Sequence, residues 1–131
     1  MQLSPSYANV TNELIDFLNS RFSEAEQMGI TRQQICVDPG IGFGKTLSQN
    51  YEIFANIKKF VSSFDCVMLG ASRKRFLRDT VREKEPTNII GATCTTTTYG
   101  VFQGVKIFRV HDVKENRHAA DVASTIKTYQ D

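Results

Sequence analysis

Residues 38–46 read Asp-Pro-Gly-Ile-Gly-Phe-Gly-Lys-Thr (DPGIGFGKT), a glycine-rich loop that follows a short apolar run. The stretch ends like a phosphate-binding loop, but such a loop needs a glycine where this chain has Pro39. The dinucleotide-binding fingerprint fails as well, because Lys45 stands where its third glycine belongs. What remains is a carboxylate, Asp38, at the end of a predicted strand, followed by glycines that permit positive φ or a close approach of a ligand to the backbone.

The composition is that of one folding unit without a strong overall charge. A chain of 131 residues that is 40% hydrophobic suffices for one modest core, and its net charge of +2 means that any anion site must be local. Three widely spaced cysteines without a C-x-x-C pair argue against a disulfide framework or a zinc site, and we interpret them as small core hydrophobes. No apolar run approaches the roughly 20 residues that span a bilayer, and we expect a soluble, cytoplasmic protein.

Hydrophobic periodicity predicts that helices and strands alternate along the chain. Apolar residues recur every three or four positions from Ser4 to about Met28, which predicts an amphipathic helix with a proline in its first turn. The apolar run Gln34–Val37 predicts a buried strand, and Leu47–Val61 predicts a second amphipathic helix. Cys66–Leu69, which a glycine closes, predicts a second buried strand.

The C-terminal third continues this alternation. Val105–Val110 predicts a third strand, and a helix follows from about Val113 to Tyr129, with Asp112 as N-cap and Glu115 at the capping-box spacing. The segment from residue 87 to 103 is ambiguous because its run of four threonines favours a strand, whereas the alternation requires a helix. We expect a helix there.

Strands joined by helical crossovers form a parallel sheet, and ligands bind at the carboxyl ends of such strands. Polar residues stand at these ends: Asp38 after the first strand, GASRKR (70–75) after the second and RVHD (109–112) at the end of the third. Alternation along a strand places Arg109 and His111 on one side. If the chain stays extended beyond Gly70, Ser72 and Lys74 share a face as well. We therefore expect one cleft to be lined by a carboxylate, a lysine, an arginine and a histidine.

In this order and spacing, DPGIGFGKT (38–46), GASRKR (70–75) and RVHDV (109–113) resemble the dihydropteroate synthases, which are (β/α)8-barrel enzymes of folate biosynthesis. The resemblance implies that residues 1–131 are one α/β unit, the C-terminal half of a TIM barrel with strands six to eight and their helices. The family condenses 6-hydroxymethyl-7,8-dihydropterin diphosphate with p-aminobenzoate, releases pyrophosphate, and is the target of sulfonamides. The parent protein would be a transferase, and the isolated half would have weak activity or none.

The resemblance assigns the pterin contacts and the catalytic roles to three residues. Asp38 matches the carboxylate that accepts N–H bonds from the pterin and favours the positive charge developing on it as pyrophosphate departs. Lys74 matches the lysine between pterin and arylamine. Gly70 is the third expected pterin contact. Asp38 and Lys74 are the expected catalytic residues.

The other two subsites are implied in the same way. Phe43, with Lys74, matches the wall of the p-aminobenzoate pocket. Arg75 stands where many members have a serine that meets the benzoate carboxylate, which leaves open an ionic contact, a backbone contact or none. Arg109 and His111 match the pyrophosphate site, because guanidinium is suited to phosphate oxygens and barrels bind phosphate after strands seven and eight.

The resemblance also implies cofactors and partners. Mg²⁺ is expected to bind together with the pyrophosphate. In the family, the protein ligand of this ion lies in the N-terminal half of the enzyme, so no metal ligand is expected in this chain. The expected partners are the small-molecule substrates and either a complementary N-terminal half or a second copy of this chain, because the family is homodimeric. No nucleic-acid or membrane partner is expected. One alternative is a catalytically silent half-barrel that binds pterin and pyrophosphate and acts only with a partner chain. Another is a nucleic-acid binder that uses the basic run after Ser72.

Overall fold

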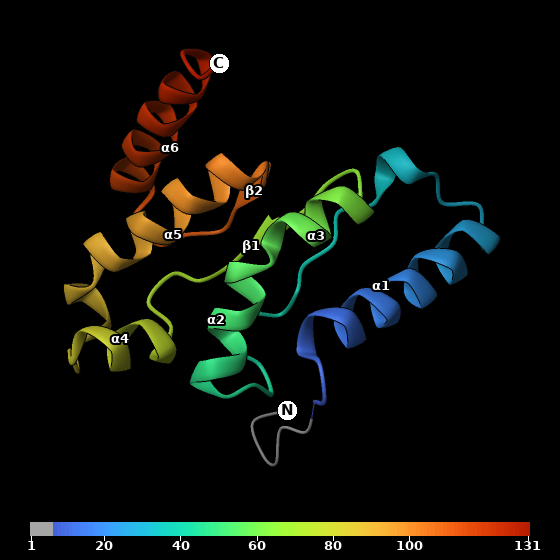
Figure 1. The fold of residues 1–131 in the computed structure, drawn as a ribbon, viewed down its shortest axis with the longest axis horizontal. Helices are drawn as coiled ribbons and strands as arrows, with labels where there is room; N and C mark the ends of the chain where they lie inside the picture. The colour runs from blue at the N-terminus through green and yellow to red at the C-terminus, as the bar shows by residue number, and fades with distance from the viewer. Residues whose placement is uncertain (1–6) are drawn as a thin grey trace.

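The computed structural model describes residues 7–131. Its helices are α1 (Val10–Gln27), α2 (Leu47–Ala55), α3 (Ile57–Ser63), α4 (Arg75–Val81), α5 (Ile90–Gln103) and α6 (Val113–Thr128), its strands β1 (Met68–Leu69) and β2 (Ile107–Phe108), and its 3-10 turns η1 (Arg32–Gln34) and η2 (Pro86–Asn88). Figure 1 shows α1 and α6 at opposite ends of the molecule, with α2, α3 and the two strands between them. None of the described helices is both long and apolar enough to cross a membrane.

The sheet is short and parallel. β1 pairs with β2 in the register Met68↔Ile107 and Leu69↔Phe108, and a single parallel bridge, Val37↔Val67, adds the first predicted strand on the other side of β1. The predicted parallel direction is therefore confirmed. The prediction of a regular strand over residues 34–37 is wrong, because Gln34 closes the 3-10 turn η1 and Val37 alone is bridged.

One face of this sheet is covered by helices and the other is open. Leu69 is buried and Phe108 is half-buried on the covered face, whereas Ile107 is 42% exposed on the opposite face. The core includes Ile53 and Phe54 of α2, Ile57 and Phe60 of α3, Leu69 of β1, and Ile41, Phe64 and Val67 from the connecting segments. On the open face, the strand side chains remain accessible to solvent.

Two predicted helices have different ends. The first begins at Val10, where the side chain of the N-cap Asn9 accepts the N–H of Asn12 at 3.0 Å, so the expected start at Ser4 is too early; Ser4 itself lies outside the described residues. The predicted helix over 47–61 is two helices, because the chain leaves helical geometry at Asn56 (φ −111°, ψ 17°). The Asn56 amide donates to the carbonyl of Glu52 at 2.9 Å.

The threonine-rich segment is helical, as expected from the alternation. It forms α5, where Thr95 donates its hydroxyl to the carbonyl of Gly91 at 2.9 Å and Thr97 donates to the buried amide oxygen of Asn116 at 2.7 Å. The second bond joins α5 to α6, which packs chiefly on it. Tertiary contacts therefore outweigh the low helix propensity of these residues.

Gly100 of α5 lies where the helix meets the sheet, and the close approach predicts a sensitive position. A Cβ atom there would lie 2.6 Å from Cε1 of Phe108 and 3.2 Å from Cδ1 of Leu69. Despite the helix preference for alanine, we expect Gly100→Ala to lower the free energy of unfolding by about 1–2 kcal/mol. Gly91 lies in the same helix, and a Cβ atom built on it would have no atom of the described residues within 4 Å apart from its chain neighbours and the backbone of the helix itself. Gly91→Ala should therefore raise the free energy of unfolding by up to about 1 kcal/mol. Urea denaturation compares the two variants, and equal effects would contradict the packing argument.

Candidate functional site

The glycine loop after Val37 has the backbone that its sequence requires. Gly40, Gly42 and Gly44 have φ of 72°, 83° and 60°, in the left-handed region that disfavours side chains. The half-buried carboxylate of Asp38 accepts the N–H of Gly40 through Oδ1 at 2.8 Å. The turn thus fixes one carboxylate oxygen in place and does not form a cradle of amides around a phosphate.

Two side chains hold this loop from within. Asn50, which is 3% exposed in α2, accepts the N–H of Gly42 through Oδ1 at 2.8 Å. The ammonium of Lys45 donates to the carbonyl oxygens of Gly40 and Phe43, each at 2.7 Å. Partial burial lowers the pKa of Lys45, whereas the nearby carboxylate of Asp38 acts in the opposite direction. Sequence reasoning missed both anchors, because nothing in their local pattern shows that they bond to the loop.

Lys74 joins the second motif to this loop. Its ammonium donates to the carbonyl of Ile41 and lies 4.6 Å from the ring centroid of Phe43, which is 42% exposed. Burial lowers the pKa of Lys74, while Asp38 raises it and the cations Arg109 and Lys45 lower it further. The structure therefore brings together the carboxylate, the lysine and the exposed aromatic ring that the sequence singled out.

The chain does not stay extended beyond Gly70, contrary to the expectation. It turns at Arg73, whose φ is 59°, and the N–H of Lys74 donates to the carbonyl of Ala71 at 3.2 Å. Ser72 is 6% exposed. Although the turn replaces the predicted alternation, Ser72 and Lys74 still line one cavity of about 190 Å³. The cavity is lined by Gly70, Ser72, Lys74, Arg109, Val110 and His111.

Ser72 links the second and third motifs. Its Oγ lies 2.9 Å from Nδ1 of His111 and accepts the backbone N–H of the same residue at 3.1 Å. The hydroxyl thus fixes both the ring and the backbone of His111, and sequence reasoning did not assign it a role. Arg109 crosses Gly70 so closely that a Cβ on this glycine would lie 3.1 Å from Nη2. A side chain at position 70 would therefore force the guanidinium of Arg109 to move.

Arg75 points away from the cavity. Its side chain is 85% exposed and forms an i,i+4 ion pair with Asp79 at 3.3 Å along α4. The structure therefore places six of the seven expected site residues around the loop and the small cavity, and places Arg75 on the surface of α4. A benzoate carboxylate near Lys74 would need another partner or a different Arg75 rotamer.

The predicted capping box of the last helix is wrong. α6 begins at Val113 after Asp112, but the Asp112 side chain makes no capping bond. Its carboxylate accepts two bonds from the Arg73 guanidinium, at 3.0 and 3.4 Å, because the turn after β1 brings that cation to the start of α6. The ion pair ties the second motif to the third beside the cavity.

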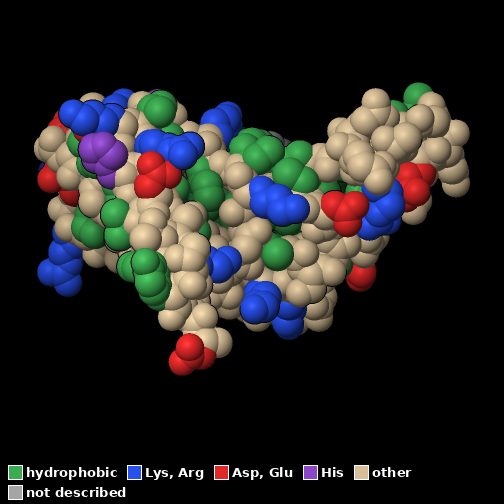
Figure 2. Space-filling view, turned by 90° about the horizontal axis from the view of Figure 1, so that it is seen from above, with side chains coloured by type: hydrophobic (Ala, Val, Ile, Leu, Met, Phe, Trp, Pro, Cys, Tyr) green, Lys and Arg blue, Asp and Glu red, His purple; other side chains and the backbone are tan. Residues whose placement is uncertain are grey.

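The charges around the site favour an anion in the small cavity. Lys74, Arg109 and His111 line it, and none of the described residues that line it carries a carboxylate. Asp38 belongs to the loop beside it, and the carboxylate of Asp112 is paired with Arg73. On the face shown in Figure 2, lysine and arginine side chains stand apart and are interspersed with acidic ones. Within residues 7–131, no three His, Cys, Asp or Glu side chains cluster closely enough to hold a metal ion.

Comparisons with known proteins identify the family of this chain. Residues 1–111 match the family model described as pterin binding enzyme. Dihydropteroate synthase of Staphylococcus haemolyticus is 35% identical over 119 residues, which are 90% of this chain and 45% of that protein. The chain thus spans about half the length of the curated relatives it matches.

Solved structures show the same similarity. The Xanthomonas albilineans dihydropteroate synthase in complex with 7,8-dihydropteroate superposes with a TM-score of 0.92 at 28% identity, covering 96% of this chain and 48% of that one. The Yersinia pestis enzyme with a sulfonamide drug complex superposes with a TM-score of 0.93 at 26% identity, covering 98% and 47%. The resemblance seen in the sequence motifs is confirmed, and this chain belongs to the pterin-binding enzyme family.

Proposed function

We propose that this chain is the C-terminal half of a dihydropteroate synthase, with strands six to eight of a (β/α)8 barrel. Its site takes part in the condensation of 6-hydroxymethyl-7,8-dihydropterin diphosphate with p-aminobenzoate, in the cytoplasm, as a step of folate biosynthesis. The observation that carries the proposal is the convergence of Asp38, Lys74 and Phe43 beside a small cationic cavity. The ligands named for the similar enzymes, 7,8-dihydropteroate among them, support the same assignment.

The residues suit the two charges that the reaction develops. The carbon–oxygen bond between the exocyclic methylene carbon of the pterin and pyrophosphate breaks, and pyrophosphate leaves with the bonding electron pair. The arylamine nitrogen then forms a bond to that carbon and releases one proton to solvent. Asp38, with one oxygen bonded to Gly40, retains acceptor capacity for pterin N–H groups and stabilises positive charge on the ring. Arg109 and His111 face the leaving pyrophosphate, and Ser72 orients the His111 ring for that contact.

Lys74 occupies the position between these two regions. Its ammonium contacts the Ile41 carbonyl and the Phe43 ring, so it borders both the pterin and the arylamine sides of the loop. Because burial lowers the pKa of Lys74, its proton is held less tightly than that of an ordinary lysine. In this proposal Lys74 orients the arylamine and Phe43 forms the wall against which the aromatic ring packs.

Mg²⁺ would enter with the pyrophosphate, as the family resemblance implies. The residues described here do not supply a site of their own: Asp38 is bonded to the loop and faces the cations Lys45 and Lys74, whereas Mg²⁺ needs several oxygen ligands. A protein ligand of the ion would come from a complementary half. No step above depends on the metal.

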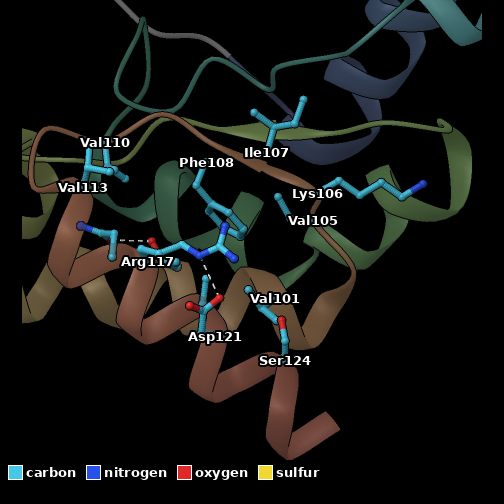
Figure 3. Close-up of a pocket in the computed structure, with 13 residues that line it drawn as sticks. Val101, Val105, Lys106, Ile107, Phe108, Val110, Val113, Arg117, Asp121 and Ser124 are labelled. Atoms are coloured by element: carbon cyan, nitrogen blue, oxygen red, sulfur yellow. Dashed lines mark hydrogen bonds and ion pairs between the residues drawn. The ribbon is translucent and has the colours of Figure 1, made fainter. Parts of the chain in front are cut away.

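The open sheet edge supports a partner chain. Beyond β2 lies a cavity of about 430 Å³ between α5, β2 and α6, lined by Val101, Phe108 and Val113 with the Arg117–Asp121 ion pair at 2.9 Å (Figure 3). Ile107 and Val113 there are 42% and 65% exposed. We propose that a complementary N-terminal half, or a second copy of this chain, covers this edge.

This partner proposal predicts the sedimentation behaviour of the chain. Because the apolar edge is costly to expose, the chain alone should sediment as species larger than a monomer at micromolar concentrations, and adding an N-terminal half should convert them into a one-to-one complex. Analytical ultracentrifugation across a wide concentration range measures this. A single monomeric species throughout would contradict the partner proposal and leave the site assignment untouched.

Activity is tested best in a chimera. The segment of Staphylococcus haemolyticus dihydropteroate synthase that matches this chain is replaced by this chain, and turnover of the pterin diphosphate with p-aminobenzoate is measured. We expect turnover well above the uncatalysed background. If the chimera unfolds cooperatively and binds both substrates but shows no turnover, the synthase assignment fails. The silent binding half-barrel would then remain, and calorimetry of the chain alone with pyrophosphate would test it.

A further inference from the structure

Two cysteines at the opposite end of the short sheet contact each other. The thiol of Cys66 donates to Sγ of Cys36 at 3.5 Å, and the thiol of Cys36 donates to the carbonyl of Val37 at 3.9 Å. Cys36 is exposed and Cys66 is partly exposed, so the interpretation of both as core hydrophobes is wrong. Neither belongs to the site proposed above, although Cys36 lies only two residues before Asp38.

The backbone holds these two residues side by side. Each comes directly before a member of the parallel bridge Val37↔Val67, and the bridge is fixed by bonds from Val37 N–H to the Cys66 carbonyl at 3.0 Å and from Met68 N–H to the Val37 carbonyl at 2.8 Å. Neighbouring strands lie about 4.8 Å apart, which is within the usual Cα separation of disulfide-bonded residues. The sulfur atoms need to approach by only about 1.5 Å to reach bonding distance, which side-chain rotation supplies.

From this geometry we infer that Cys36 and Cys66 form a dithiol site that a low-molecular-weight disulfide, such as glutathione disulfide, oxidises to an intramolecular disulfide. The Cys66 thiolate attacks one sulfur of the reagent, forms a mixed disulfide and releases one small thiolate, which takes up a proton. The Cys36 thiolate, after losing its proton to solvent, then attacks the Cys66 sulfur and releases the second small thiol. The protein loses two hydrogens, and one reagent disulfide is reduced to two thiols.

The proposed order of attack follows from the surroundings of the Cys36 thiol. The pKa of Cys36 is raised to about 11, first by partial burial of its sulfur and then by the neighbouring Cys66 and Asp38. Cys36 therefore carries little thiolate at neutral pH, and in this proposal it acts second. The third cysteine, Cys94, lies in α5, and burial together with Glu115 and Asp112 raises the pKa of its thiol. It serves as the internal control.

The test uses the reduced chain and glutathione disulfide, with intact mass spectrometry and peptide mapping. We expect a product that has lost two hydrogens, with a peptide pair joined through Cys36 and Cys66, in the wild type and equally in Cys94→Ser. Cys36→Ser should instead keep a stable glutathione adduct on Cys66. Separate glutathione adducts on Cys36 and Cys66 in the wild type, or disulfides that involve Cys94 or join two chains, would overturn the inference.

A second experiment measures the effect of the cross-link on the melting temperature, Tm. The disulfide would close a loop between residues 30 apart in the sequence, and restricting the unfolded chain in this way should raise Tm by roughly 5 °C or more. A reducing agent should reverse the shift. The same treatment of Cys66→Ser should leave Tm without this gain. An oxidised wild type with unchanged or lowered Tm would show that the two sulfurs are not placed for an unstrained bond. None of these outcomes depends on synthase activity.

Discussion

Asp38→Asn in the chimeric synthase is expected to lower kcat/KM by at least about 100-fold while leaving the loop folded. The asparagine side-chain oxygen can still accept the Gly40 N–H, which Asp38 now accepts at 2.8 Å, so the turn is retained. What is lost is the negative charge, which in our proposal binds pterin N–H groups and stabilises the positive charge that develops on the pterin as pyrophosphate departs. Because this interaction strengthens toward the transition state, kcat should fall along with kcat/KM.

The same substitution has an electrostatic consequence for two lysines. The carboxylate of Asp38 raises the pKa of Lys45 and of Lys74 against the effect of burial, so its removal should lower both values further. Asp79→Asn is the matched control, because that carboxylate pairs with Arg75 on the surface of α4 and should leave turnover within about twofold. An Asp38→Asn chimera that retains wild-type kcat/KM would remove Asp38 from the catalytic assignment.

Asn50→Ala is expected to lower the free energy of unfolding by about 2–4 kcal/mol. The Asn50 side chain is buried, accepts the Gly42 N–H at 2.8 Å and donates to the carbonyl of Thr46 at 2.9 Å. Alanine removes both bonds, leaves a polar cavity and releases the loop that presents Phe43. Urea denaturation followed by circular dichroism measures the change.

The control lies in the same helix. Ser48 is exposed in α2, and Ser48→Ala should change the free energy of unfolding by no more than about 0.5 kcal/mol. If Asn50→Ala proved as mild as this control, Asn50 would not be a main anchor of the loop. The comparison therefore separates the contribution of the α2 anchor from the intrinsic preference of three positive-φ glycines.

The sequence predicted the features that follow from the alternation of helices and strands along the chain. The helix over the threonine run, the start of α6 at Val113 and the parallel direction of the strands are confirmed. The convergence of Asp38 with Lys74 followed from placing polar residues after strands, a rule that holds because parallel strands end at one edge of a sheet. These predictions survived although the strands are shorter than expected.

Long-range contacts account for what the sequence did not predict. The carboxylate of Asp112 pairs with Arg73 across the site instead of capping its helix, and no local pattern encodes this choice. Ser72 bonds to His111, 39 positions away, and the next residue, Arg73, has a left-handed conformation that is unusual for a residue with a side chain. At the break between α2 and α3, the side chain of Asn56 donates to the carbonyl of Glu52, a bond that apolar periodicity does not reveal.

The parallel pairings have a consequence for how quickly the chain folds. Val37 meets Val67 and Met68 meets Ile107, so each pairing joins residues roughly 30 to 40 positions apart through only a few ladder bonds. Closing such loops costs chain entropy before the few bonds compensate for it, whereas each helix forms from contacts within a few turns. Sheet formation should therefore be the slow step in the kinetics, with helical signal in stopped-flow experiments appearing ahead of the pairing that assembles Asp38, Lys74 and Arg109.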